Sequence, residues 1–166
     1  GEGFGAVAKS IGGGGYMLFI LPDKGVSPED IIGSDTAAGL MYDLYKNDST
    51  HTIVHLSVPK FDISSDIKLK EGLEKLGVSD VFSGGKADFT PISDSGLFLS
   101  EIQHSARVAI DEKGITAAAY TIEQTAGAAP PEGEVDFTLD RPFIFAITGD
   151  TCDVLFTGIV NRLSND

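Results

Sequence analysis

The chain has little cysteine: Cys152 is the only one among its 166 residues. A single cysteine excludes a disulfide within the chain. Because Cys152 has no histidine near it in sequence, we interpret it as a small packing residue rather than a catalytic thiol. The length is sufficient for one domain with a hydrophobic core.

Basic residues are also scarce. The sequence has 12 lysines and arginines against 25 aspartates and glutamates, a net charge of −13. Nucleic acids and anionic membranes bind clustered basic residues, so neither is expected as a partner, and we interpret the charge as an aid to solubility. The longest apolar run, residues 16–21, is far shorter than the ~20 residues of a membrane-spanning helix.

The usual motifs of catalysis and metal binding are missing. His51 and His55 could share a metal on a helix, but they lie in a β-patterned stretch, where that spacing separates them by about 13 Å. Residues 12–15 are glycines without the Lys-Ser/Thr of a phosphate loop, so they predict a turn. No Ser-His-Asp or Cys-His set can be assembled from the spacing. We therefore expect neither an enzyme nor a metal or other cofactor.

Short strands and a few helices are predicted instead. Residues 16–21 form an unbroken apolar run, typical of a strand buried on both faces. Ser27 and Pro28 are the cap and first residue of a helix. Further strands are expected at 50–58, 60–63, 97–110, 134–139, 142–148 and 154–160, and further helices at 35–46 and over 67–76. No linker divides residues 1–166. With these strands and helices, the predicted class is α+β, rich in strand.

Residues 112–121 read Glu-Lys-Gly-Ile-Thr-Ala-Ala-Ala-Tyr-Thr. Small uncharged side chains of this kind suit backbone that is sometimes exposed and sometimes packed into a sheet. The surrounding segment, 113–133, has few large apolar groups. A loop of about 20 residues is uncommon in a compact domain and is usually functional or disordered.

Residues 112–121 and their flanks resemble the hinge of a serpin, an inhibitor of serine proteases. The resemblance extends over residues 19–23, 58–61, 73–83, 87–89, 102–108, 111–114, 135–137, 140–145 and 156–161, which include Leu-Pro-Asp and Asp-Arg-Pro-Phe motifs. It begins well past the middle of a complete serpin. We therefore expect a C-terminal portion of the serpin fold, with a reactive centre loop at about 113–133.

The resemblance implies a suicide inhibitor whose loop is cleaved and then inserts as a strand into the large sheet. The hinge would comprise Glu112, Gly114, Ile115, Thr116, Ala117, Ala118, Ala119 and Thr121. Alternation from Ile115 directs Ala117, Ala119 and Thr121 inward. Glu123 departs from this pattern, because a buried carboxylate without a partner costs several kcal/mol.

Family spacing places the reactive bond at Ala128-Ala129, with Ala129-Pro130 as the alternative. Alanine before the cut indicates elastase-like or subtilisin-like serine proteases as partners. Lys60, together with Glu112, matches an ion pair that serpins have at the top of the sheet, and His104 matches a histidine beneath the strands that open. Lys60 and His104 are expected to act as structural switches.

Two other functions are considered. One is a non-inhibitory serpin that acts as a carrier, chaperone or protease substrate. The other is a binding domain unrelated to inhibition. The alanine-rich hinge favours an inhibitor, because non-inhibitory members often have bulky or charged residues there. We expect an extracellular or secreted protein that is a monomer when full length.

Overall fold

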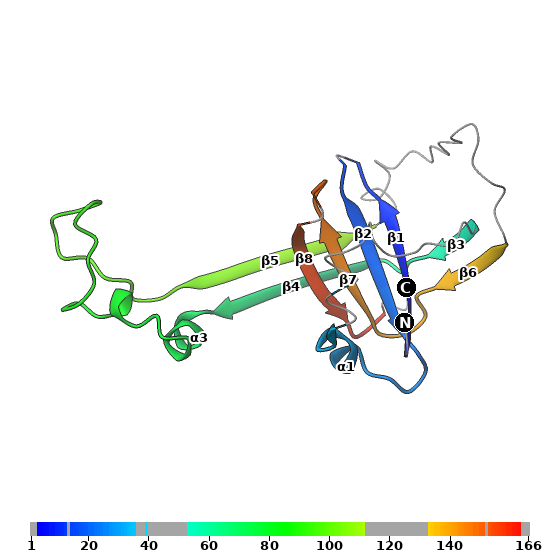
Figure 1. Ribbon diagram of the computed structural model, residues 1–166, viewed down its shortest axis with the longest axis horizontal. Coiled ribbons are helices and arrows are strands. Elements are labelled where there is room, and N and C mark those ends of the chain that lie inside the picture. The colour runs from blue at the N-terminus through cyan, green and yellow to red at the C-terminus, as the bar shows by residue number, and fades with distance from the viewer. Residues whose placement is uncertain are drawn as a thin grey trace. The chain divides into compact units, whose positions relative to one another are not determined.

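The computed structural model describes residues 3–12, 14–35, 39, 53–111, 133–151 and 153–163. The chain divides into two compact units. Residues Gly1–Phe61 and Ala109–Asp166 form the first, and residues Asp62–Val108 form the second. Figure 1 labels their helices and strands.

The first unit contains a four-stranded antiparallel sheet of order β1-β2-β7-β8. Its strands are β1 (Phe4–Ser10), β2 (Tyr16–Pro22), β7 (Phe143–Thr148) and β8 (Val154–Val160). The predicted buried strand at 16–21 and the predicted strands at 142–148 and 154–160 are confirmed. Strand β1 was not predicted, because its small side chains give weak alternation.

The two central strands are buried on both faces. On one face Leu18 and Ile20 of β2 join Ile144 and Ala146 of β7 in a core cluster. On the other face the ring of Phe143 lies edge-on to those of Phe19 and Phe61, at centroid distances of 6.1 and 5.7 Å. Burial on both sides explains why these strands are continuous apolar runs rather than alternating ones.

Helix α1 (Pro28–Ile32) packs against this sheet through Ile31, a member of the core cluster. The Ser27 hydroxyl accepts a hydrogen bond from the backbone N–H of Asp30 at 3.2 Å. The predicted cap and helix start are therefore confirmed. The predicted helix over 35–46 falls almost entirely outside the described residues.

A second, two-stranded sheet of the first unit pairs β3 (Ile53–Ser57) with β6 (Glu134–Thr138) in parallel. Both strands were predicted. The pair is extended where the Leu139 N–H donates to the Ser57 carbonyl at 3.0 Å. The ring of Phe137 lies close to Gly5, where a Cβ would stand 3.0 Å from it.

Strands β4 (Phe61–Lys68) and β5 (Gln103–Ile110) are neighbours and run in opposite directions (Figure 1). Within the second unit, β4 is followed by helix α3 (Lys70–Lys75) and then by a 3₁₀ turn at Asp80–Phe82, and both come before β5 in the chain. The chain leaves α3 through Gly77, whose φ of 92° favours glycine.

Three predicted boundaries in this unit are wrong. The strand expected over 60–63 continues to Lys68 beside β5, and the helix expected over 67–76 therefore begins only at Lys70. The strand expected over 97–110 begins only at Gln103. Pairing between strands decided these boundaries against local pattern. None of the helices in the described part of the chain has the length and apolar character of a membrane span.

Candidate functional site

The predicted reactive loop joins two strands. Strand β5 ends at Ile110, which is buried, and the described chain resumes at Gly133, immediately before β6. The Gly133 carbonyl accepts a hydrogen bond from the Ile53 N–H at 3.0 Å, and Ile53 pairs in register with Glu134. Ile110 and Gly133, which lie on either side of the predicted loop, therefore belong to or adjoin hydrogen-bonded strands.

His55 lies beside the loop exit. Its Nε2 is 3.3 Å from Oε2 of Glu134, and its partner across the parallel strands is Asp136. Both side chains of the His55–Glu134 pair are largely exposed. Within the described ranges no group of three or more His, Cys, Asp or Glu side chains is placed to hold a metal ion.

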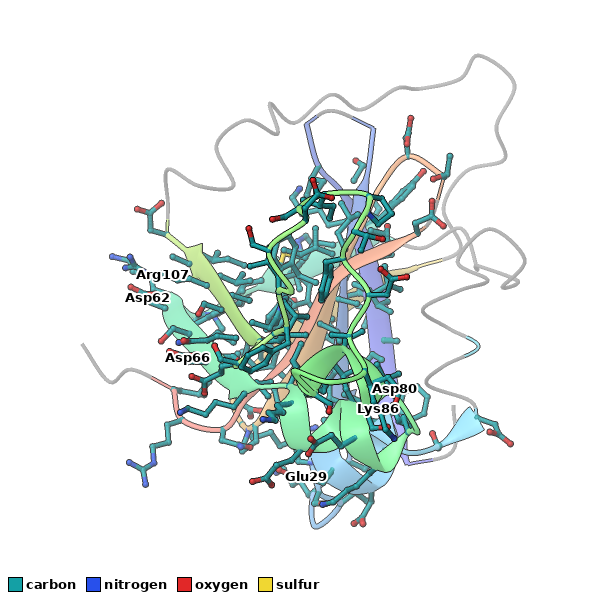
Figure 2. The ribbon with its side chains drawn as sticks, turned by 90° about the vertical axis from the view of Figure 1, so that its left-hand side faces the viewer. Glu29, Asp62, Asp66, Asp80, Lys86 and Arg107 are labelled. Carbon is teal, nitrogen blue, oxygen red and sulfur yellow. The ribbon has the colours of Figure 1, made fainter. Side chains whose placement is uncertain are left out.

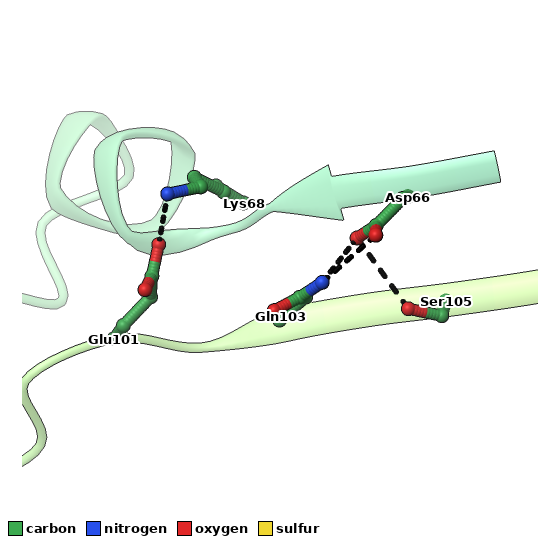
Figure 3. Close-up of polar contacts among 5 residues, drawn as sticks. All are labelled: Asp66, Lys68, Glu101, Gln103 and Ser105. Carbon is green, nitrogen blue, oxygen red and sulfur yellow. Dashed lines mark hydrogen bonds and ion pairs between the residues drawn. The ribbon is translucent and has the colours of Figure 1, made fainter.

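Polar side chains connect β4 and β5, as Figure 3 shows. Gln103 donates from Nε2 to both carboxylate oxygens of Asp66, at 2.6 and 2.8 Å. The hydroxyl of Ser105 donates to the same carboxylate at 3.4 Å. At the end of β4, Lys68 Nζ is 2.7 Å from Glu101 Oε1. We call these residues, with Asp62 and Arg107, the polar ladder.

One contact of the polar ladder is bidentate. Arg107 donates from Nε to Oδ1 of Asp62 at 2.8 Å and from its terminal nitrogen to Oδ2 at 2.5 Å, and Figure 2 shows the two side chains together. Paired donors of this kind match the geometry of a carboxylate. The hydrogen bond from Arg107 lowers the pKa of Asp62 below its ordinary value, and the one to Glu101 raises the pKa of Lys68.

All members of the polar ladder lie on one face of the two strands, because side chains alternate along a strand. The opposite face carries Ile63, Ala106 and Val108, which are partly buried, together with His104. Sequence analysis missed the polar ladder. Its signal is present as two runs of alternating polar residues, 62–68 and 101–107, whose complementary partners appear in reverse order.

The structure places only part of the predicted site. Lys60 is exposed between β3 and β4, and His104 is exposed on β5. The hinge residues from Glu112 to Thr121 and the predicted reactive bond at Ala128-Ala129 lie outside the described residues. The pairing predicted between Lys60 and Glu112 and the switch role of His104 therefore stay predictions.

Comparison with known proteins identifies the family. Residues 11–163 match the family model described as Serpin (serine protease inhibitor). Serpin-Z12 of Oryza sativa subsp. japonica is 35% identical over 156 residues, which are 90% of this chain and 36% of that protein. Leukocyte elastase inhibitor A of Mus musculus is 42% identical over 111 residues, 64% of this chain and 28% of that protein.

Solved structures agree. The thermophilic serpin tengpin in its native state has a TM-score of 0.73 and 35% identity, over 98% of this chain and 43% of tengpin. Thyroxine-binding globulin in complex with thyroxine has a TM-score of 0.74 and 28% identity, over 98% of this chain and 42% of that protein. The chain spans between 27% and 36% of the length of the curated relatives it matches. With its strands arranged as part of the serpin fold, the chain belongs to the serpin family.

Proposed function

We propose that this chain carries the reactive loop of a serine protease inhibitor that acts as a suicide substrate. The observation that carries the proposal is the position of residues 112–132 between β5 and β6, two strands held by hydrogen-bonded neighbours. A loop tethered to sheet strands at both ends can present a peptide bond to a protease. The relative named leukocyte elastase inhibitor A supports inhibition as the activity.

The second part of the proposal is insertion of the cleaved loop beside β5. Among the described strands, β5 has one neighbour, β4, so a second neighbour can be added at its other edge. Addition of a strand to a sheet edge is a general mode of peptide recognition. Chain direction favours insertion beside β5, because the proposed loop follows the end of β5 in the sequence and can fold back along it.

Backbone hydrogen bonds supply enough free energy for such an insertion. On the order of 15 new bonds at about 0.5–1.5 kcal/mol each contribute about 7–20 kcal/mol. The stability of a typical protein is about 5–15 kcal/mol. Distortion of an attached protease is therefore energetically feasible.

We assign the reactive bond to Ala128-Ala129 and the target to an elastase-like or subtilisin-like serine protease. A small residue before the cut suits a small, apolar specificity pocket, whereas proline after the cut disfavours the alternative Ala129-Pro130. Glu112 with Lys60, and His104, are assigned as switches that hold the sheet before insertion. An extracellular or secreted site of action and a monomeric state belong to the same proposal.

The experiment uses the protein expressed from its complete reading frame and incubated with pancreatic elastase or subtilisin. We expect a complex that resists SDS and a cut after Ala128, located by mass spectrometry. Elastase whose catalytic serine is replaced by alanine is the control, and it should give no covalent complex. Complete cleavage with no complex in any reaction would contradict inhibition.

A non-inhibitory carrier is the second candidate. It is favoured by the similarity to thyroxine-binding globulin, whose structure contains thyroxine. The same incubation separates the two functions, because a carrier is expected to be cleaved in its loop without trapping the protease. The small side chains at Ala117 and Ala119 favour the inhibitor.

A further inference from the structure

We propose that the polar ladder is a register clamp that holds β5 on β4 while a strand is added at the other edge of β5. This inference rests on the proposed insertion of the loop. It assigns Arg107, Asp62 and Asp66 as positioning residues, which act on the loop only through β5. Their described contacts all lie within the second unit of the chain.

The arrangement of the contacts makes the register specific. A slip of one residue would move every side chain of one strand to the opposite face and break all of the contacts. A slip of two residues in one direction would bring Asp66 beside Glu101, in the place of Lys68, and set two carboxylates together. The same slip in the other direction would leave Arg107 beside Ser64 instead of Asp62.

The contacts also favour one edge of β5 over the other as the place where a strand is added. The edge towards β4 has side-chain bonds in addition to strand pairing, including the bidentate Arg107–Asp62 pair. Isolated exposed ion pairs contribute little, but bidentate geometry and several linked charges are the recognised exceptions. Strand addition is therefore directed to the edge that the polar ladder does not cross.

Position along β5 connects the clamp to the loop. Arg107 precedes the last residue of the strand, Ile110, by only three residues, and the hinge begins directly afterwards. A strand added beside β5 takes its register from the backbone groups of β5. If β5 moved on β4, those groups would no longer be fixed in place, and insertion would slow relative to hydrolysis of the acyl-enzyme.

The test measures partition between trapped complex and cleaved inhibitor, using the full-length protein and active elastase. We expect Arg107→Ala to raise the cleaved-to-trapped ratio by about two- to fivefold, in line with the modest strength of cross-strand pairs. Arg107→Lys should raise the ratio less than Arg107→Ala does, because it keeps the charge but loses the second hydrogen bond. The double exchange of Asp62→Arg with Arg107→Asp should give a lower ratio than either exchange alone.

Two further variants separate positioning from stability. Lys86→Ala removes another exposed ion pair of the same unit, to Asp80 at 3.6 Å, and should leave the ratio unchanged (Figure 2). Gln103→Ala removes the bond to Asp66 without changing any charge and should raise the ratio. The rate of acyl-enzyme formation should stay constant in every variant, and thermal melting shows that each is folded.

The outcomes are distinct. A trapped wild-type complex with a higher ratio in Arg107→Ala and Gln103→Ala supports the clamp. A trapped wild-type complex with an unchanged ratio in both folded variants overturns the clamp and leaves inhibition intact, as does a lower melting temperature without any change in ratio. No trapped complex with the wild type overturns the proposed inhibition and the clamp together.

Discussion

Gly15 lies so close to Thr148 that a Cβ atom on it would stand 2.1 Å from the Thr148 carbonyl oxygen. The two residues adjoin in the pairing of β2 with β7, where Tyr16 is the register partner of Thr148. The Thr148 hydroxyl donates to the Tyr16 carbonyl at 3.4 Å and is itself buried. This end of the sheet therefore depends on the absence of a side chain at Gly15.

Gly15→Ala should lower the free energy of unfolding by about 1–3 kcal/mol, the usual range for overpacking. The colliding atom belongs to the backbone of β7, which cannot turn aside as a flexible side chain would. Urea unfolding followed by circular dichroism measures the change. The matched control is Gly72→Ala on α3, where nothing lies within 4 Å of the added Cβ. That variant should be stabilised by about 0.5–1 kcal/mol, and an equal loss in both would contradict the steric argument.

Phe143→Ala should lower the free energy of unfolding by about 3–5 kcal/mol, because it leaves a cavity between two other rings. Phe143 is 0% exposed and contacts Phe19 and Phe61 edge-on. Phe156 on β8 is 43% exposed and provides the control. The same urea titration should show a change of under about 1 kcal/mol for Phe156→Ala. Similar losses at the two positions would show that Phe143 is not the centre of the core.

The contribution of the Asp62–Arg107 pair to the free energy of unfolding should disappear in acid. Arg107 lowers the pKa of Asp62 from the ordinary value of 3.8. The folded state therefore binds a proton less readily than the unfolded state, and stability rises with pH across that window. The contribution is complete above the unfolded-state pKa and is lost as pH falls through the lower folded-state value.

Urea unfolding of the wild type and Asp62→Asn between pH 7 and pH 2 measures this effect. The variant should be less stable at neutral pH, and the difference should shrink as the wild-type carboxylate becomes protonated. A difference that stays constant over the whole range would show that the carboxylate charge does not stabilise the pair.

Ala119→Arg should convert the proposed inhibitor into a substrate, with no trapped elastase and unchanged cleavage after Ala128. Alternation from Ile115 directs position 119 into the sheet, where an unpaired guanidinium cannot be accommodated. Ala118→Arg is the control, because the same alternation directs that side chain outward. Gel electrophoresis in SDS measures the trapped fraction. Equal trapping by both variants would show that the loop does not insert in this register.

Local pattern predicted the elements whose sequence is uniformly apolar or alternates between apolar and polar residues, and a helix with a clear start signal. The apolar run at 16–21, the alternation at 134–139 and the Ser27-Pro28 helix start each correspond to an observed element. Pattern failed where the partner strand decided the structure. Strand β1 has small side chains and exists through its pairing with β2, and β4 extends to Lys68 through its pairing with β5.

The candidate site also has one part that the sequence predicted and one part that it did not. The composition of the predicted hinge from Gly114 to Thr121 and the resemblance to serpins are properties of the sequence itself, and the family assignment was confirmed. The polar ladder could not be deduced from either strand alone. Asp62 and Arg107 are 45 positions apart, and only the pairing of β4 with β5 brings the carboxylate to the guanidinium.

The sequence by itself determined the family, the apolar central strands and the composition of the predicted hinge, because each depends on the order of side chains along the chain. Tertiary structure alone decided which strands are neighbours, how far they extend and which charges meet. The physical reason is that a strand makes none of its backbone hydrogen bonds within itself, so all of them depend on other segments. Those segments are chosen by packing and register over the whole fold.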